Sequence, residues 1–357
     1  MRKHFSEHFQ PTEAEKQNIW AEALFVFDTN ILLNLYRLSK ETSLGMMEVL
    51  KKLKGRLFLP HQVSFEFYEH REEEIARQVN AFEDVRKYLK EIPKDFKKQF
   101  SRHPCIPITA IAEALTKCAE EQVNLVADSQ GKNQLNFLDH DDPILPALDA
   151  LFTDCSEPPY TDADNDLLNE KVEECFQKNL PPCFVYESGQ KPKSPTNYHK
   201  GDSRVWFQII KHAGTTKKPI IFVTADDKHN WWRHIKIGNK DRPIGPHFQL
   251  IRDIELASGN RFLMYTQESF LEEAPKYLGV SEQKQIIEEI KQIKEVDTDE
   301  SLVCHECGDQ YSIQEIFEYN SHYFDGPYYY NRGCDKYCLA CWLGVGPNDI
   351  SKLKDTA

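Results

Sequence analysis

The stretch that decides the fold is Phe25-Val26-Phe27-Asp28-Thr29-Asn30, in which an apolar run of strand-forming residues ends at an acid, a hydroxyl and an amide. The next segment, Ile31-Leu32-Leu33-Asn34-Leu35-Tyr36-Arg37, spaces its apolar residues as a helix does. Asp28 is therefore expected at the carboxyl end of a buried strand, where open α/β sheets place their ligand sites. A carboxylate at that position can hold a divalent cation.

The composition indicates a globular protein that can bury a sizeable core. The chain has 357 residues, of which 40% are hydrophobic and 28% charged. No apolar run reaches the roughly 18 residues of a membrane-spanning helix, and the amino terminus lacks the apolar core of a signal peptide. We therefore expect a cytoplasmic location and no membrane partner. The net charge of −13 disfavours a large nucleic-acid footprint, although a small cleft filled by cations would still bind phosphate locally.

Strand and helix patterns alternate up to about residue 280. After the first strand, further strands are expected at 57–60, 219–224, 250–251 and 262–266. This alternation is typical of a mostly parallel sheet with helices on both faces. One or two long, charged helices are predicted over residues 63–100, within a mainly helical insertion at about 68–200.

Several acids stand at the ends of these elements. Asp28 ends the first strand, and Asp226 and Asp227 follow the strand at 219–224. Asp202 is expected at the start of a helix, and Glu66 on the first turn of the helix after Pro60. Carboxylates that converge from separate elements suit Mg²⁺ or Mn²⁺, and such a site can activate water and neutralise a phosphodiester. Each acid alone also has a structural interpretation as a helix cap or turn residue.

Five segments, taken in order, resemble a large bacterial branch of the PIN-like nucleases over about residues 20–280. They are 26–37; 59–63 with Glu66, Phe67 and Arg71; Pro181-Pro182; Gly201-Asp202 with Val205-Trp206; and 221–226 with Lys228 and Trp231-Trp232. The resemblance implies an α/β fold with a PIN-like central parallel sheet flanked by helices. It also implies an acidic cleft and Mg²⁺- or Mn²⁺-dependent hydrolysis of nucleic acid, with RNA favoured over DNA. An endoribonuclease of this kind would leave 5′-phosphate and 3′-hydroxyl ends and would act as a toxin or a phage-defence effector.

The resemblance also implies roles for individual residues. The catalytic and metal-binding quartet would be Asp28, Glu66, Asp202 and Asp226. Asp28 would be the first metal ligand, Glu66 and Asp202 would complete the cation site, and Asp226 would hold a second cation or a metal-bound water. Supporting roles fall to Thr29, Asn30, Thr224, Asp227 and Lys228.

The sequence departs from the family pattern at three positions. Asn230 stands where an acid is expected, Cys183 where a glycine is usual, and Asp227 duplicates Asp226 so that their roles are exchangeable. The Asn230 departure is expected to alter substrate contacts. A second interpretation of the chain is a non-hydrolytic, RNA- or protein-binding regulatory module with a PIN-like fold. A dehalogenase-type phosphatase is disfavoured, because it needs an acid at the position of Asn30.

The ten cysteines fall into two groups. Cys105, Cys118, Cys155, Cys175 and Cys183 are scattered and are interpreted as reduced thiols in small apolar roles. Two C-x-x-C pairs, Cys304 with Cys307 and Cys338 with Cys341, have the spacing of a structural Zn²⁺ site. Cys334 is an alternative ligand.

The chain is accordingly divided into three parts. Residues 1–280 form the PIN-like domain, 281–300 a helical linker, and 301–357 a zinc-ribbon-like or treble-clef-like module. The aromatic runs Tyr323-Phe324 and Tyr328-Tyr329-Tyr330 lie between the two cysteine pairs. They would either pack around the metal or form a surface for a protein partner or for bases.

Overall fold

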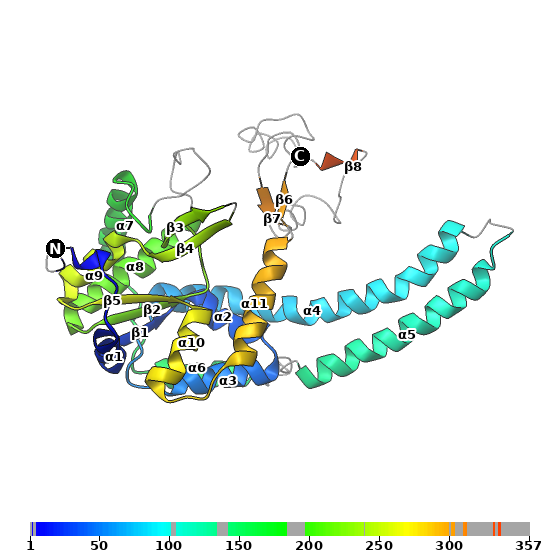
Figure 1. The fold of residues 1–357 in the computed structure, drawn as a ribbon, viewed down its shortest axis with the longest axis horizontal. Helices are drawn as coiled ribbons and strands as arrows, with labels where there is room; N and C mark the ends of the chain where they lie inside the picture. The colour runs from blue at the N-terminus through cyan, green and yellow to red at the C-terminus, as the bar shows by residue number, and fades with distance from the viewer. Residues whose placement is uncertain are drawn as a thin grey trace. The chain divides into compact units, whose positions relative to one another are not determined.

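Two apolar strands whose side chains are all buried lie side by side in a three-stranded parallel sheet. The sheet has the spatial order β1-β2-β5 and comprises β1 (Leu24–Phe27), β2 (Ile220–Thr224) and β5 (Phe262–Thr266) (Figure 1). Its register pairs Phe27 with Val223 and Thr224 with Thr266. Because the strands are parallel, their carboxyl ends lie at one edge, and the residue after β1 comes to lie beside the last residue of β2.

This computed structural model describes residues 2, 5–100, 105–133, 142–183, 197–238, 240–299, 301–303, 310–312, 331–332 and 335–336. The chain divides into two compact units, Met1–Ile287 and Glu288–Ala357. The sheet belongs to the first unit. No helix in the described ranges is long and apolar enough to cross a membrane.

Helices cover both faces of the sheet, as the alternating pattern predicts. On one face, Phe270 of α10 packs its ring 6.2 Å from that of Phe25 and 5.4 Å from that of Phe27. On the other face, the Trp206 ring of α8 lies 5.4 Å from the Phe262 ring. Figure 1 shows α8 and α9 on one side of the sheet and α1 and α10 on the other. These flanking helices are α1 (Glu13–Glu22), α8 (Asn197–Thr216), α9 (Phe248–Ser258) and α10 (Gln267–Leu278).

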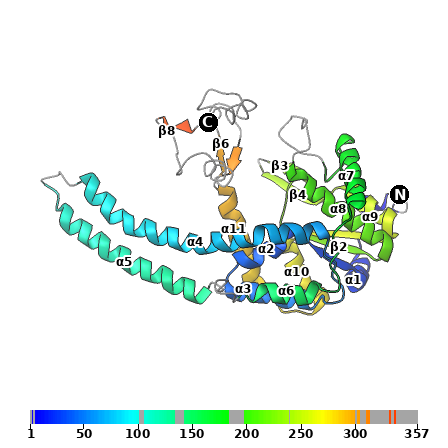
Figure 2. The ribbon, with the colours of Figure 1, turned by 180° about the vertical axis from the view of Figure 1, so that it is seen from behind.

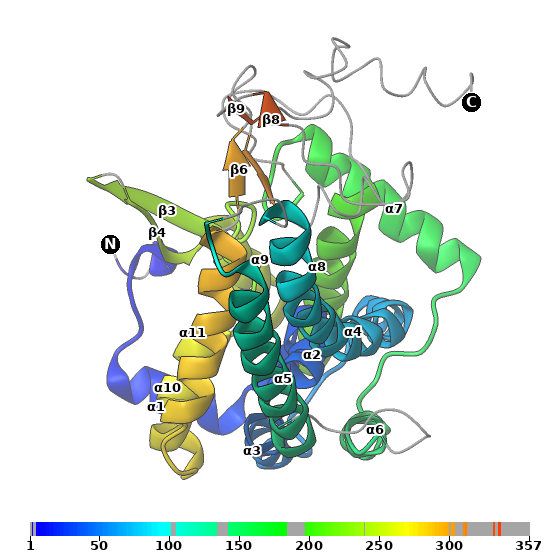
Figure 3. The same ribbon diagram turned by 90° about the vertical axis from the view of Figure 1, so that its right-hand side faces the viewer.

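A mainly helical segment separates β1 from β2. It begins with α2 (Thr29–Arg37) and α3 (Lys40–Lys51) and continues with α4 (His61–Phe100), α5 (Ile108–Asn133), α6 (Ile144–Phe152) and α7 (Asp162–Gln177). The charged run at 63–100 forms one helix, which continues through Pro93. The distal part of α4 and α5 run antiparallel and side by side (Figures 2 and 3).

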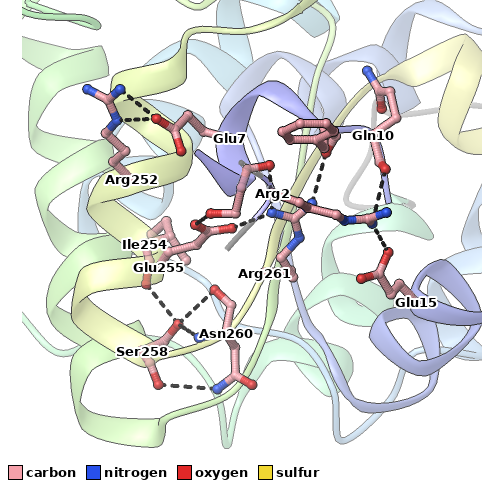
Figure 4. Close-up of polar contacts among 12 residues, drawn as sticks. Arg2, Glu7, Gln10, Glu15, Arg252, Ile254, Glu255, Ser258, Asn260 and Arg261 are labelled. Atoms are coloured by element: carbon pink, nitrogen blue, oxygen red, sulfur yellow. Dashed lines mark hydrogen bonds and ion pairs between the residues drawn. The ribbon is translucent and has the colours of Figure 1, made fainter. Parts of the chain in front are cut away.

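The amino-terminal segment is tied to α9 and to β5. Its short 3₁₀ helix, η1 (Ser6–His8), carries Glu7, whose Oε1 accepts a hydrogen bond of 2.8 Å from Arg252 Nε (Figure 4). Arg261 donates to the carbonyl oxygens of Ser6 and Phe9, at 2.9 Å each. Thr12 forms a capping box with Glu15 at the start of α1.

Five local features differ from what the sequence predicts. The apolar pair at 250–251, predicted as a strand, lies inside α9, and residues 57–60 pair only through isolated bridges of Leu57 and Leu59. The hairpin of β3 (Trp232–Ile237) and β4 (Lys240–Pro246) was not predicted. Cys175 and Cys183, interpreted as free thiols, form a disulfide. The helix that carries Asp202 begins at Asn197, so Asp202 lies on its second turn and not at its start as expected.

The second unit is described only in short pieces. The helix α11 (Lys284–Asp299) runs across the boundary between the units and fills most of the stretch predicted as a linker. It is followed by antiparallel pairs of β6 (Ser301–Val303) with β7 (Gln310–Ser312) and of β8 (Asn331–Arg332) with β9 (Asp335–Lys336). The candidate zinc ligands Cys304, Cys307, Cys334, Cys338 and Cys341 lie outside the described residues.

Candidate functional site

Asp28 is fixed at the point where β1 passes into α2. It is the N-cap of α2, and its Oδ1 accepts a hydrogen bond of 2.8 Å from the Thr29 backbone N–H. Its Oδ2 accepts from Thr224 Oγ1 at 2.7 Å and from Asn30 Nδ2 at 3.0 Å. Only 7% of Asp28 is exposed. Three donors therefore orient a nearly buried carboxylate at the carboxyl edge of the sheet.

Asn30 and Thr224 link the loops that follow the two central strands. Asn30 Oδ1 accepts from the Ala225 backbone N–H at 2.9 Å, while Thr224 Oγ1 accepts from the Asp226 backbone N–H at 3.0 Å. The loop that carries Asp226 is thereby held against the one that carries Asp28. The supporting positions proposed for Asn30 and Thr224 are thus adjacent to Asp28 in space.

Glu66 reaches the same edge from α4. Thr29 Oγ1 donates to Glu66 Oε2 at 2.8 Å, and Gln62 Nε2 donates to Oε1 at 2.8 Å. A Cβ added to Gly201 of α8 would lie 2.4 Å from Glu66 Oε1. Because such a contact is far below van der Waals distance, Gly201 is what permits α8 and Glu66 to approach each other.

Asp202 and Asp226 complete the set. Asp202, on the second turn of α8, accepts a hydrogen bond of 2.9 Å from Asn230 Nδ2. Asp226 Oδ2 lies 2.9 Å from Lys228 Nζ, and Asp226 Oδ1 accepts from the Lys228 backbone N–H at 3.0 Å. The neighbouring Asp227 is exposed. Of the two consecutive acids, Asp226 is therefore the one held in this polar network.

The carboxylates lie close enough to disfavour one another's charge. Burial, with the charges of Glu66 and Asp226, raises the pKa of Asp28 to about 6. Burial, with the charges of Asp28 and Asp226, raises the pKa of Asp202 to about 7, although Lys228 and the Asn230 hydrogen bond act in the opposite direction. The pKa values of Asp28 and Asp202 are thus raised by acids that come from different elements, which is a property of the folded site and not of the sequence.

The donor atoms fit a hard cation that keeps much of its water. Among the residues that the structure describes, no three or more His, Cys, Asp and Glu side chains form a group arranged to hold a metal ion. Mg²⁺ is commonly held by only one or two carboxylates, its other positions being filled by water and substrate phosphate. All of these donors are oxygen atoms, which suits such a cation, and so do the raised pKa values of Asp28 and Asp202. The buried Asn230 Oδ1 has no hydrogen-bond partner.

A comparison with protein families matches the PIN like domain model to residues 24–246, which is more than half of the chain. The chain belongs to the PIN-like domain family. The match contains β1, β2, the helical insertion and all four candidate acids. The family suggests a nuclease-type fold in general terms. No curated protein and no solved structure matches the chain.

The predictions from the sequence include no contact with Glu66 for Gln62 or Gly201, and they assign to Asn230 an effect on substrate contacts and not a contact with Asp202 in this PIN-like site. Gln62 and Gly201 contact Glu66, or limit what can stand beside it, and Asn230 holds Asp202. Gln62 stands one helical turn before Glu66, and this i, i+4 spacing could have predicted that their side chains are neighbours on the helix. The positions of Gly201 and Asn230 carried no such signal, because their partners are distant in sequence.

Proposed function

We propose that this protein is a divalent-cation-dependent nuclease that hydrolyses phosphodiester bonds of RNA, with Asp28, Glu66, Asp202 and Asp226 as its catalytic carboxylates. The observation that carries the proposal is the crowding of these acids, from four separate elements, at the carboxyl edge of a parallel sheet. Membership of the PIN-like family supports the reaction class. The choice of RNA, and a role as toxin or phage-defence effector, rest on the family resemblance alone.

The side chains of the site would act chiefly by holding charge in fixed positions. Bound Mg²⁺ or Mn²⁺ would lower the pKa of water and offset phosphate charge. Asp28 and Asp202 would hold the cation, each oriented by neutral donors, namely Thr224 and Asn30 for the first and Asn230 for the second. Glu66 would complete the cation site, and Thr29 keeps it in place.

Lys228 is the basic residue best placed for a substrate phosphate. Its side chain is 51% exposed and its ammonium lies beside Asp226. Arg71 is instead hydrogen-bonded to Asp142 and Tyr36, and the guanidinium carbon of Arg233 lies 3.7 Å from the centre of the Phe248 ring. In this arrangement Lys228 would neutralise Asp226 in the free protein and contact a phosphate oxygen in the complex.

Cleavage of labelled RNA and of DNA of the same sequence tests the proposal, with Mg²⁺, with Mn²⁺ and with chelator. Cation-dependent cleavage of RNA is expected, and Asp28→Asn should reduce it on the order of 100-fold or more. Asp226→Asn should reduce it strongly, whereas exposed Asp227→Asn should not. Asp128→Asn, an exposed acid on α5, is the matched control. Folded wild type that cleaves neither polymer, or Asp28→Asn that cleaves as fast as Asp128→Asn, would falsify the assignment.

A non-hydrolytic binding module is the second candidate. It is favoured by the lack of a ready three-acid metal group among the described residues, together with the net charge of −13. Titration with Mn²⁺ separates the two, because an inert module has no need to bind the cation near Asp28. Binding of RNA without Mn²⁺ affinity and without cleavage would support this second candidate.

We also propose a structural Zn²⁺ held by Cys304, Cys307, Cys338 and Cys341. The proposal is supported by the spacing of the two C-x-x-C pairs. Four thiolates would close the coordination shell, so the module would serve folding, or contact a partner protein, and would take no part in hydrolysis.

A further inference from the structure

Asn230 has a buried oxygen that nothing in the described structure satisfies. The residue is 6% exposed and lies in the turn between β2 and β3. Its Nδ2 donates to Asp202 Oδ2 at 2.9 Å, while its Oδ1 is buried without a hydrogen-bond partner. An unsatisfied buried acceptor costs about 1–3 kcal/mol, and native proteins contain few of them. The unpaired oxygen therefore calls for a ligand.

Contacts of two tryptophans hold the turn that carries Asn230 in place. The Trp231 ring packs 5.1 Å from that of Phe222 and 5.9 Å from that of Trp206. Trp232 Nε1 donates to the Asp226 carbonyl oxygen at 2.7 Å. The amide of Asn230 is thus presented from a fixed backbone and not from a loose loop.

The orientation of the amide is set by Asp202. Exchange of its oxygen and nitrogen would place two acceptors against each other at 2.9 Å, which an ionised Asp202 does not tolerate. The two amide heteroatoms are about 2.2 Å apart by standard bond lengths. Asn230 Oδ1 therefore lies within about 5 Å of Asp202 Oδ2, beside the acidic cluster.

We propose that Asn230 Oδ1 is a ligand of the divalent cation, next to Asp202. This inference rests on the proposed nuclease function and adds to it a neutral oxygen ligand at the position where the family pattern has an acid. Carbonyl oxygens are good ligands for Mg²⁺ and Mn²⁺. An amide supplies such an oxygen without adding charge to carboxylates that already repel one another. Among the described residues, no three His, Cys, Asp or Glu side chains are arranged to hold a metal ion, so the Asn230 oxygen would add a ligand that the acids alone do not supply.

Binding of Mn²⁺ alone to the full-length protein at pH 8 tests the role of Asn230. Asn230→Leu has nearly the same shape but no oxygen, and it should weaken Mn²⁺ binding about 10- to 100-fold. Asn230→Asp keeps an oxygen but cannot donate to Asp202, and it should bind Mn²⁺ as tightly as wild type or more tightly. Asn34→Leu removes another buried amide, which donates to Gln267 on α10, and should leave Mn²⁺ affinity unchanged. Melting temperatures establish that each variant is folded, and Asn230→Ala replaces the leucine variant if that one is not.

The outcomes separate three cases. Weak binding by both Asn230→Leu and Asn230→Asp would mean that Asn230 only positions Asp202, and this overturns the ligand role. Unchanged binding by the leucine variant also overturns it, while cation-dependent cleavage by wild type leaves the nuclease function standing. If the wild-type protein neither binds Mn²⁺ nor cleaves RNA, the proposed nuclease function is wrong, and the ligand role of Asn230 is wrong with it.

Discussion

Among single residues, Gly201 gives the sharpest link between packing and activity. Alanine at 201 would favour the helical backbone of α8, since glycine costs about 1 kcal/mol relative to alanine in a helix interior. Its Cβ, however, would lie 2.4 Å from Glu66 Oε1, so the carboxylate would have to leave the positions set by Thr29 and Gln62. We predict that Gly201→Ala lowers RNA cleavage at least tenfold with little change in melting temperature.

Gly214 provides the matched control on the same helix. A Cβ there would meet only Ala257 atoms, at 3.8 and 3.9 Å, which is ordinary contact. Gly214→Ala should keep full cleavage activity and raise the melting temperature slightly. Equal cleavage by the two alanine variants would contradict the placement of Glu66 against α8.

The raised pKa values of Asp28 and Asp202 predict how stability depends on pH in protein freed of Mg²⁺ and Mn²⁺. Both values, about 6 and about 7, exceed the roughly 3.9 of an unfolded aspartate. Between about pH 4 and pH 7 the folded state therefore binds more protons than the unfolded chain, and the free energy of unfolding falls as pH rises. Each pKa unit is worth about 1.4 kcal/mol. Melting curves at pH 5 and 7.5 should show a larger drop for wild type than for Asp202→Asn, and added Mn²⁺ should reverse the wild-type drop at pH 7.5. An equal drop in both proteins would argue against a crowded, buried Asp202.

At the scale of elements, the site depends on the contact between α2 and α4, because Asp28 caps the start of α2 and α4 carries Glu66. Arg37 Nη2 of α2 lies 2.7 Å from Glu74 Oε2 of α4, and Glu74 is 3% exposed. Removal of the arginine leaves a buried carboxylate whose remaining partners among the described residues are Arg77 and Gln78. We predict that Arg37→Met lowers the free energy of unfolding, measured in urea, by about 2–4 kcal/mol.

A surface ion pair supplies the control for this prediction. Lys178 pairs with Glu174 at 60% and 62% side-chain exposure, so Lys178→Met should change the unfolding free energy by less than about 0.5 kcal/mol. Similar losses of unfolding free energy in Arg37→Met and Lys178→Met would show that the Arg37–Glu74 ion pair contributes no more to stability than a solvent-exposed pair. If Arg37→Met loses more RNA cleavage activity than its decrease in folded protein explains, the Arg37–Glu74 ion pair also helps to position Glu66.

The elements that sequence reasoning located best are those with long, unambiguous patterns. The adjacent strands β1 and β2 are uninterrupted apolar runs ending at polar residues, and the sequence predicts both together with the acids that follow them. The pair at 250–251 was misassigned because two apolar residues do not distinguish a strand from a turn of helix. The β3–β4 hairpin was missed because β3 mixes Arg, His and Lys with apolar residues. Local patterns do not encode contacts between residues that are distant in sequence. The contacts of Glu66 with Gly201 and of Asn230 with Asp202 are of this kind.

At the scale of the whole molecule, the cysteines separate by unit. In the first unit, Cys175 and Cys183 form a disulfide, and Cys105, Cys118 and Cys155 are free. The other five lie in the second unit, where the two C-x-x-C pairs are. Thiolates select Zn²⁺, whereas the oxygen donors of the first unit select Mg²⁺ or Mn²⁺. The two proposed metal sites should therefore be separable by mutation.

Elemental analysis of protein purified without chelators should find about one zinc per chain. Cys307→Ser and Cys338→Ser should each lose it, because three remaining thiolates no longer close the tetrahedral shell. Cys105→Ser, which removes an exposed free thiol of the first unit, should retain it, and so should Asp28→Asn despite its loss of cleavage. Cys334→Ser decides whether that residue replaces one of the four ligands, since loss of zinc would place it in the shell. Wild type without zinc, or zinc retained in both Cys307→Ser and Cys338→Ser, would remove the zinc module. Zinc lost in Asp28→Asn would instead mean that the metal occupies the carboxylate site of the first unit.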